Sequence, residues 1–208
     1  MSMWKTESKN GVVVATYSNP PMNYFRADGT RELAGLIERW KSPDVRVVIL
    51  TGGMTGKFIT HYSVEELAAY ASDREALRSI GISLTAGYHK LLDDLRALPK
   101  PLIAAMNGDT MGGGFELSLS CDIRIGATGD HRFGFPEVKL GIIPGGSGTQ
   151  KLPRLGGRRC SEPRDEPLST APSEVGAASV AATQALVEES SGRRQERSFT
   201  RNAPTSPA

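Results

Sequence analysis

The sequence holds 208 residues, carries a formal net charge of +2 at pH 7 and has an apolar share of 38%. Such a length buries one sizeable core, while the weak charge gives no field that would attract nucleic acid or a membrane surface. No apolar run approaches a membrane span and no leader peptide opens the chain, so we expect a cytoplasmic protein. Its two cysteines, Cys121 and Cys160, lie in unlike surroundings, which argues against a structural disulfide.

The first quarter of the chain predicts a strand, a helix and a second strand. Residues 11–17 form a valine-rich strand, which Pro20 and Pro21 end because proline lacks a backbone donor and restricts the residue before it. Apolar side chains recur at helical spacing over residues 27–41, the pattern of an amphipathic helix packed on a core. The β-branched run at 45–51 predicts a strand buried on both faces, and this alternation indicates a parallel sheet in an α/β fold.

Two helical segments follow the second strand. Ser63-x-x-Glu66 matches a capping box, which predicts that a helix starts at the next residue after the serine. A further helical pattern covers residues 73–98, where two glycines interrupt it and a kink is expected. His89 falls inside this pattern and is interpreted as a structural residue.

The stretch at 101–119 carries the clearest chemical signal. Its apolar start, residues 101–106, is bounded by proline and Asn-Gly and predicts a buried strand. After a turn, glycines 112–114 open a predicted helix, and the free N–H groups at such a start favour an oxyanion. Glu116 on this helix and Glu137 further along add two carboxylates, which suggests acid–base chemistry beside the oxyanion. A phosphate cradle and a plain tight turn are the alternatives at the glycines.

The segment after Asp122 predicts two short strands, at 123–127 and 131–135, and then a glycine-rich turn. That turn, Gly145-Gly-Ser-Gly-Thr149, resembles a nucleophile elbow only loosely, because threonine ends it and no strand leads directly into it. A serine hydrolase is therefore disfavoured.

Ordered motifs run through this part of the chain: Ile103–Gly108, Met111–Leu117, Cys121–Asp122, Phe133–Glu137, Leu140–Gly146 and Gly148–Gln150. With the earlier Asn19–Asn23 and Val47–Gly52, they resemble the successive motifs of the enoyl-CoA hydratase/isomerase (crotonase) family over roughly residues 10–157. The resemblance implies a crotonase-like α/β fold, a spiral of ββα units with a mostly parallel sheet flanked by helices. It also implies one domain over residues 1–157, in which the turn at 145–149 leads into a helix.

The resemblance implies the reversible hydration of a 2-enoyl-CoA thioester. The thioester carbonyl oxygen would accept hydrogen bonds from the N–H groups of Gly113 and Thr60, the latter placed by aligning Phe58 with a family phenylalanine. Glu116 and Glu137 would hold one water between them and exchange protons with the substrate carbons. Neither a metal nor a separate cofactor is expected, since coenzyme A is part of the substrate.

Further substrate-binding residues are implied by the same resemblance. They are Pro21, Met22 and Asn23 near the coenzyme A moiety, and Thr60, His61, Tyr62, Ser63 and Gly112 around the thioester. The loop departs from the small residues usual in the family, because His61 replaces a glycine, which restricts φ and adds bulk. His61 is either a partly solvated loop residue or an additional base or donor.

The sequence changes character after Gly157. Residues 158–208 are dominated by Arg, Ser, Ala, Pro and Glu, and this composition predicts disorder apart from a weak Ala-rich helix over 174–189. The abrupt change suggests a shifted reading frame or an unrelated replacement tail. Crotonases continue here into helices that complete the acyl pocket and the trimer interface, so a homo-trimer or hexamer is expected only where the fold is complete.

Two classes of function remain open. The first is an active enoyl-CoA hydratase, and the second is a catalytically incompetent crotonase-like fragment that binds acyl-CoA or another subunit. Isomerisation, thioester hydrolysis or dehalogenation would use the same oxyanion hole with acid and base placed differently. The pair Arg193-Arg194 gives little support to nucleic-acid binding, because acidic residues nearby cancel its field.

Overall fold

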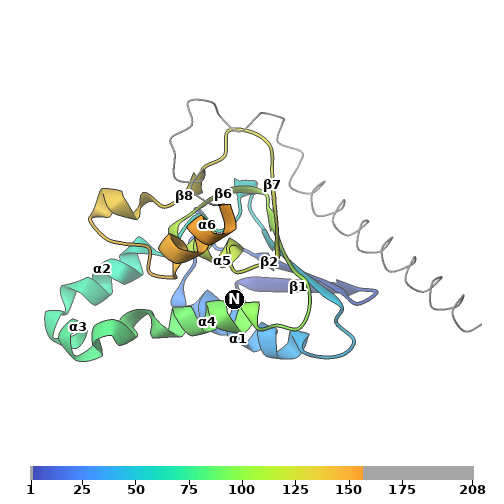
Figure 1. Cartoon of the computed structure of the whole chain (residues 1–208), viewed down its shortest axis with the longest axis horizontal. Helices are drawn as coiled ribbons and strands as arrows, with labels where there is room; N and C mark the ends of the chain where they lie inside the picture. Colours follow the sequence, from blue (N-terminus) through green and yellow to red (C-terminus); the bar gives the residue numbers. More distant parts are fainter. Residues whose placement is uncertain (1, 157–208) are drawn as a thin grey trace, which may run out of the picture.

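The computed structural model describes residues 2–156, whose strands form two sheets (Figure 1). The larger sheet consists of β1 (Trp4–Lys9), β2 (Val12–Tyr17), β3 (Val47–Gly52), β5 (Leu102–Met106) and β7 (Ile123–Gly126), in that spatial order. β1 pairs antiparallel with β2, whereas every other neighbouring pair in this sheet is parallel. The architecture is the mostly parallel α/β fold that the resemblance implied.

The smaller sheet and the helices complete the described part of the chain. The smaller sheet consists of the parallel strands β4 (Gly56–Lys57), β6 (Gly108–Met111) and β8 (Phe133–Gly134). The helices are α1 (Ala27–Trp40), α2 (Val64–Ser72), α3 (Arg74–Ile80), α4 (Ala86–Arg96), α5 (Gly112–Ser118) and α6 (Gly148–Gly156), with the 3-10 helices η1 (Gly81–Thr85) and η2 (Pro136–Leu140). Figure 1 shows α1 and α4 side by side along the larger sheet.

Apolar side chains from helices and strands form the main core. Leu33 of α1 and Leu92 of α4 are fully buried together with Leu50 of β3. Because successive strand residues point to opposite faces, Ile49 belongs instead to a second buried cluster with Ile103 of β5. β3 is thus buried on both faces, as its β-branched run predicted.

Three local predictions differ from the structure. The sequence does not predict β1, because Trp4 is its only buried residue and no apolar alternation marks the strand. β6 replaces the turn expected before the glycines. The single helix expected over 73–98 is divided into α3, η1 and α4, since Gly81 adopts a φ of 54°, outside the right-handed helical region.

Between residues 2 and 156, no helix is both long enough and apolar enough to cross a membrane. Cys121 is buried and forms no disulfide within this part of the chain. The predictions for the tail at 158–208, including its disorder, its Ala-rich helix and the surroundings of Cys160, lie outside the described residues.

Candidate active site

The glycines at 112–114 begin α5 directly after β6, so the predicted helix start is confirmed. Gly112 has a φ of 50°, and a Cβ on Gly114 would lie 2.0 Å from the Ile59 carbonyl oxygen, so both positions require glycine. The N–H of Gly113 lies in the first helical turn, where backbone donors have no partner within the helix. It is therefore a candidate donor to an oxyanion.

The loop at 58–63 packs against this helix start and is held by the segment at 22–25. The Thr60 N–H donates to the Asn23 carbonyl oxygen (3.3 Å), and the Thr60 hydroxyl donates to the Met22 carbonyl oxygen (2.6 Å). Asn23 itself is fully buried. The fold thus brings together two segments that lie far apart in the sequence and that the resemblance assigned to the substrate.

Tyr62 presents a free backbone donor to α5. Phe25 pairs with His61 and Ser63, the residues before and after Tyr62. The Phe25 N–H donates to the His61 carbonyl oxygen (2.8 Å), and the Ser63 N–H donates to the Phe25 carbonyl oxygen (2.7 Å). The residue between two such partners turns its N–H to the opposite side. Within the described chain the Tyr62 N–H has no hydrogen-bond partner, and its nitrogen lies 3.5 Å from where a Cβ on Gly113 would stand.

This geometry corrects the expectation for the second donor of the oxyanion hole. Alignment of the loop assigned that role to the Thr60 N–H, but the Asn23 carbonyl oxygen already accepts from it. Tyr62, two residues further on, is the better candidate because its N–H has no partner within residues 2–156. Sequence alone gives no sign of this, because the choice depends on which backbone groups Asn23 and Phe25 occupy.

Glu116 lies in α5 and is buried, with 1% of its surface exposed. Its carboxylate accepts hydrogen bonds from the N–H of Gly146, at 2.7 and 2.8 Å to its two oxygens, and from the N–H of Gly148 at 2.8 Å. Burial raises the pKa of Glu116, while these hydrogen bonds and the charges of Lys151 and His89 oppose the rise. The carboxylate is firmly oriented, and its pKa is shifted toward the range useful for proton transfer at neutral pH.

Glu137 reaches the start of α5 from η2. Its Oε1 lies 2.7 Å from the position of a Cβ on Gly112, and its Oε2 is buried without a hydrogen-bond partner among residues 2–156. Burial and, to a smaller extent, the charge of Glu116 raise the pKa of Glu137. Glu116 is therefore near enough to raise the proton affinity of Glu137.

Tyr88 of α4 is a neighbour of this site that the sequence does not single out. Its hydroxyl donates to the Gly113 carbonyl oxygen, and its ring centroid lies 5.8 Å from that of Tyr62. Burial, assisted by the charge of Glu116, raises the pKa of Tyr88 well above its usual value, so the phenol stays neutral. In the sequence it is one apolar position of a helical pattern, and only the fold places it beside the glycines.

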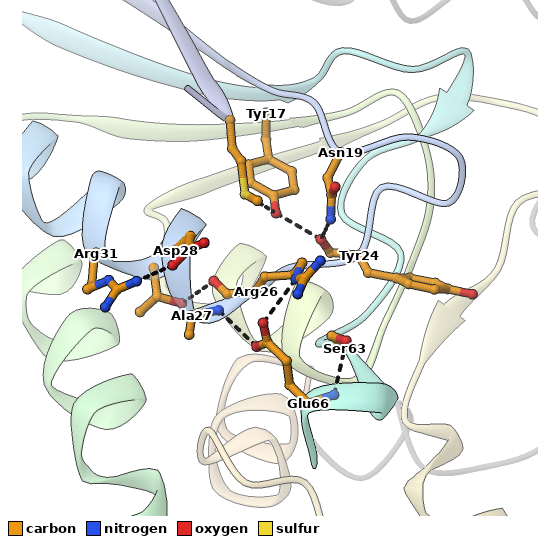
Figure 2. A network of polar contacts seen from close by, with 11 residues as sticks. Tyr17, Asn19, Tyr24, Arg26, Ala27, Asp28, Arg31, Ser63 and Glu66 are labelled. Carbon is orange, nitrogen blue, oxygen red and sulfur yellow. Dashed lines mark hydrogen bonds and ion pairs between the residues drawn. The ribbon is translucent and has the colours of Figure 1, made fainter. Parts of the chain in front are cut away.

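Glu66 ties the loop to the start of α1 (Figure 2). Its carboxylate accepts hydrogen bonds from the Arg26 Nε–H (2.9 Å) and the Ala27 N–H (3.0 Å), while its own N–H donates to the Ser63 hydroxyl oxygen (3.3 Å). Only half of the predicted capping box forms, because the Ser63 N–H donates to Phe25 and the Glu66 carboxylate turns to α1. α2 still begins where the motif predicted.

The other predicted site residues surround this loop. His61 stacks on Tyr24 with ring centroids 4.2 Å apart, and its Nδ1 lies 2.7 Å from the Tyr62 carbonyl oxygen. Since a carbonyl oxygen only accepts, Nδ1 carries a proton in this contact. His61 is thus half-buried and fixed against two neighbours. The side chains of Pro21 and Met22, by contrast, are exposed.

The family model for enoyl-CoA hydratase/isomerase matches residues 7–163. The chain is 39% identical over 153 residues to the short-chain-enoyl-CoA hydratase of Clostridium acetobutylicum, covering 73% of this chain and 56% of that protein. It is 35% identical over 158 residues to the fatty acid oxidation complex subunit alpha of Shewanella sp. (strain W3-18-1), covering 73% of this chain and 21% of that protein. The chain therefore spans only part of the length of these relatives.

Solved structures show the same architecture. An enoyl-CoA hydratase from Bacillus anthracis is 32% identical with a TM-score of 0.68, over 77% of this chain and 61% of that chain. DspI of Pseudomonas aeruginosa is 26% identical with a TM-score of 0.74, over 91% of this chain and 81% of that chain. These matches agree with the arrangement of sheets and helices described above.

Proposed function

The chain belongs to the enoyl-CoA hydratase/isomerase family, and we propose that it catalyses the reversible addition of water to a 2-enoyl-CoA thioester, a lyase reaction. The observation that supports this most is the approach of Glu116 and Glu137 to the start of α5, both with raised pKa values. Hydration needs a base for the water and an acid for the substrate carbon. Coenzyme A enters as part of the substrate, and the proposed steps use no other cofactor.

In the proposed mechanism, the thioester carbonyl oxygen binds the N–H groups of Gly113 and Tyr62. The two donors are neighbours, since the Tyr62 nitrogen lies 3.5 Å from where Gly113 would carry a Cβ. Negative charge grows on the oxygen as water adds to the double bond, so donors fixed in advance stabilise the enolate more than the substrate.

The two carboxylates divide the proton transfers. Glu116 takes a proton from water while the water oxygen bonds to Cβ, and the π electrons move onto the thioester oxygen. Glu137 then gives its proton to Cα, which forms the new C–H bond and restores the carbonyl group. Because two neighbouring carboxylates do not both ionise freely, one acid and one base at neutral pH is the expected state. Proton exchange with solvent then returns Glu116 to its ionised form and Glu137 to its protonated form.

The loop at 58–63 and the segment at 21–23 form the proposed binding surface for the rest of the substrate. The coenzyme A moiety passes the exposed side chains of Pro21 and Met22, while His61, Tyr62, Ser63 and Gly112 surround the thioester. The hydrogen bonds from Thr60 to Met22 and Asn23 support this placement, because they join the two segments into one surface.

Hydration of crotonyl-CoA, followed as loss of the conjugated enoyl thioester absorbance, tests the proposal. We expect activity in the wild-type protein and a decrease of about 10²- to 10⁴-fold in kcat for Glu116→Gln and for Glu137→Gln. A folded wild-type protein that is inert on short and long enoyl-CoA alike would disprove the hydratase and favour an incompetent acyl-CoA-binding fragment. Activity that survives in Glu116→Gln but moves a double bond would favour isomerisation.

Two further expectations belong to the proposal: a homo-trimer or hexamer, which the family resemblance implies, and a cytoplasmic location, which was expected from the sequence. Light scattering of the full chain measures the first, and a trimer or hexamer would support the proposed enzyme, whereas an aggregating monomer would oppose it. Fractionation of cells that express the chain measures the second.

A further inference from the structure

His89 of α4 contacts the turn that holds Glu116, although the mechanism above gives it no role. Its Nδ1 lies 3.1 Å from the hydroxyl oxygen of Ser147. Ser147 stands between Gly146 and Gly148, and the N–H groups of both glycines donate to the Glu116 carboxylate. A side chain of α4 is thereby connected to the proposed base through a single residue.

The backbone of Ser147 is unfavourable for a residue with a side chain. Its φ is 74°, in the left-handed region that glycine adopts most readily. Ser147 also precedes α6, and its carbonyl oxygen accepts the N–H groups of Gln150 (3.0 Å) and Lys151 (2.9 Å). A serine in this place usually turns its hydroxyl to the first helical N–H groups, but here the hydroxyl lies against His89. The side chain therefore serves the contact with His89.

Two other contacts hold the same turn. The buried Lys151 donates from Nζ to the Gly146 carbonyl oxygen at 3.4 Å. Tyr88, next to His89 in α4, lies against Gly146, since a Cβ there would stand 2.8 Å from its ring. The direction of the Gly146 N–H group, and with it the orientation of the Glu116 carboxylate, thus depends on Lys151 and Tyr88 as well as on the contact of Ser147 with His89.

We propose that His89 is a positioning residue, whose hydrogen bond with Ser147 fixes the turn that orients the Glu116 carboxylate for proton transfer. This inference rests on the role proposed above for Glu116. Since His89 acts through the turn and not on the substrate, loss of the bond lowers kcat while KM changes little.

Variants at both ends of the contact provide the test. His89→Ala and Ser147→Ala remove the hydrogen bond, whereas His89→Asn keeps a polar group near the position of Nδ1. Ser147→Gly removes the hydroxyl and relieves the backbone at positive φ, so it is expected to fold at least as well as the wild type. Lys90→Ala is the matched control, because the Lys90 side chain is 74% exposed on the same helix. Crotonyl-CoA hydration gives kcat and KM, and amide hydrogen exchange at Gly146 and Gly148 monitors the turn without requiring activity.

We expect the alanine and glycine variants to lower kcat about tenfold with less than about a twofold change in KM, and the double variant His89→Ala/Ser147→Ala to be no worse than either single one. Exchange at the two glycine amides should be about tenfold faster in these variants. His89→Asn should restore both readouts toward wild-type values, and Lys90→Ala should alter neither.

Unchanged exchange and unchanged kcat in Ser147→Gly would overturn the inference, as would additive losses in the double variant. A wild-type protein that hydrates no enoyl-CoA, combined with the expected exchange pattern, would refute the proposed function and leave the structural role of His89 in place. The two proposals can therefore fail separately.

Discussion

The main-chain nitrogen of Tyr62 lies 3.5 Å from the point where a Cβ on Gly113 would stand, and the Tyr62 Cβ lies 3.0 Å from the same point. Glycine is the only residue that lets the start of α5 approach the loop this closely without displacing it. Two backbone donors from distant parts of the sequence thereby become neighbours.

The first prediction concerns Gly113→Ala. The new methyl group would press on Tyr62 and separate the two donors, so we expect kcat/KM for crotonyl-CoA to fall about 10²-fold. Gly87→Ala in α4 is the control, because a Cβ there meets nothing within 4 Å. That control is expected to keep its activity and to gain about 0.5–1 kcal/mol of stability. Full activity in Gly113→Ala would exclude an oxyanion hole at this position.

The second prediction separates Tyr62 from Thr60 as the donor. Incorporating the α-hydroxy analogue of tyrosine at residue 62 replaces the amide by an ester, which removes the N–H and keeps the side chain. We expect kcat to fall about 10²-fold. The same exchange at Thr60 removes its bond to Asn23 and costs about 1 kcal/mol of stability, with a far smaller loss of kcat. A larger loss of kcat from the exchange at Thr60 than from the exchange at Tyr62 would show that Thr60 is the donor.

The third prediction concerns the stability of Glu116→Gln. The pKa of Glu116 is raised in the folded state, so the folded protein binds its proton more tightly than the unfolded chain. The stabilisation from this proton is complete below the unfolded pKa and is lost as pH rises through the folded pKa. At pH 7 the wild type therefore bears the cost of burying the charged carboxylate, whereas the neutral amide of Glu116→Gln does not. We expect the variant to have a thermal midpoint at pH 7 at least equal to that of the wild type, although the activity is lost.

Thermal unfolding from pH 4 to pH 8 checks this sign. The difference in midpoint between Glu116→Gln and the wild type should grow in favour of the variant as pH rises. A variant that is less stable at pH 7 would show that the hydrogen bonds from Gly146 and Gly148 outweigh the cost of burying the charge.

The fourth prediction concerns Glu66, whose carboxylate holds the start of α1 through Ala27 and Arg26 (Figure 2). Glu66→Ala leaves that helix end without its acceptor, so we expect a loss of about 1–2 kcal/mol in the free energy of unfolding. Glu65→Ala, at the exposed neighbouring position, is expected to stay within about 0.5 kcal/mol of the wild type. Chemical denaturation measures both, and equal effects would contradict the role of Glu66.

Local sequence patterns were sufficient for several elements of this protein. The apolar run of β5 and the glycines that begin α5 were predictable from a few neighbouring residues, because a short apolar run indicates a buried strand and glycine permits the turn into a helix. β1 is different: its polar residues form a strand only because β2 offers a complete row of backbone partners. No residue pattern within Trp4–Lys9 predicts that pairing.

The candidate site divides in the same way. The family, the candidate carboxylates Glu116 and Glu137 and the glycine-rich start of α5 were predictable from sequence motifs, since motifs record which residue types a site contains. The folded arrangement was needed to see that, within residues 2–156, the N–H of Tyr62 and not that of Thr60 is free. It was also needed to see that Tyr88 contacts Gly113 and that His89 contacts Ser147. This is because hydrogen-bond partners are assigned by proximity in space, and a backbone group already bonded to one neighbour is no longer available to a substrate.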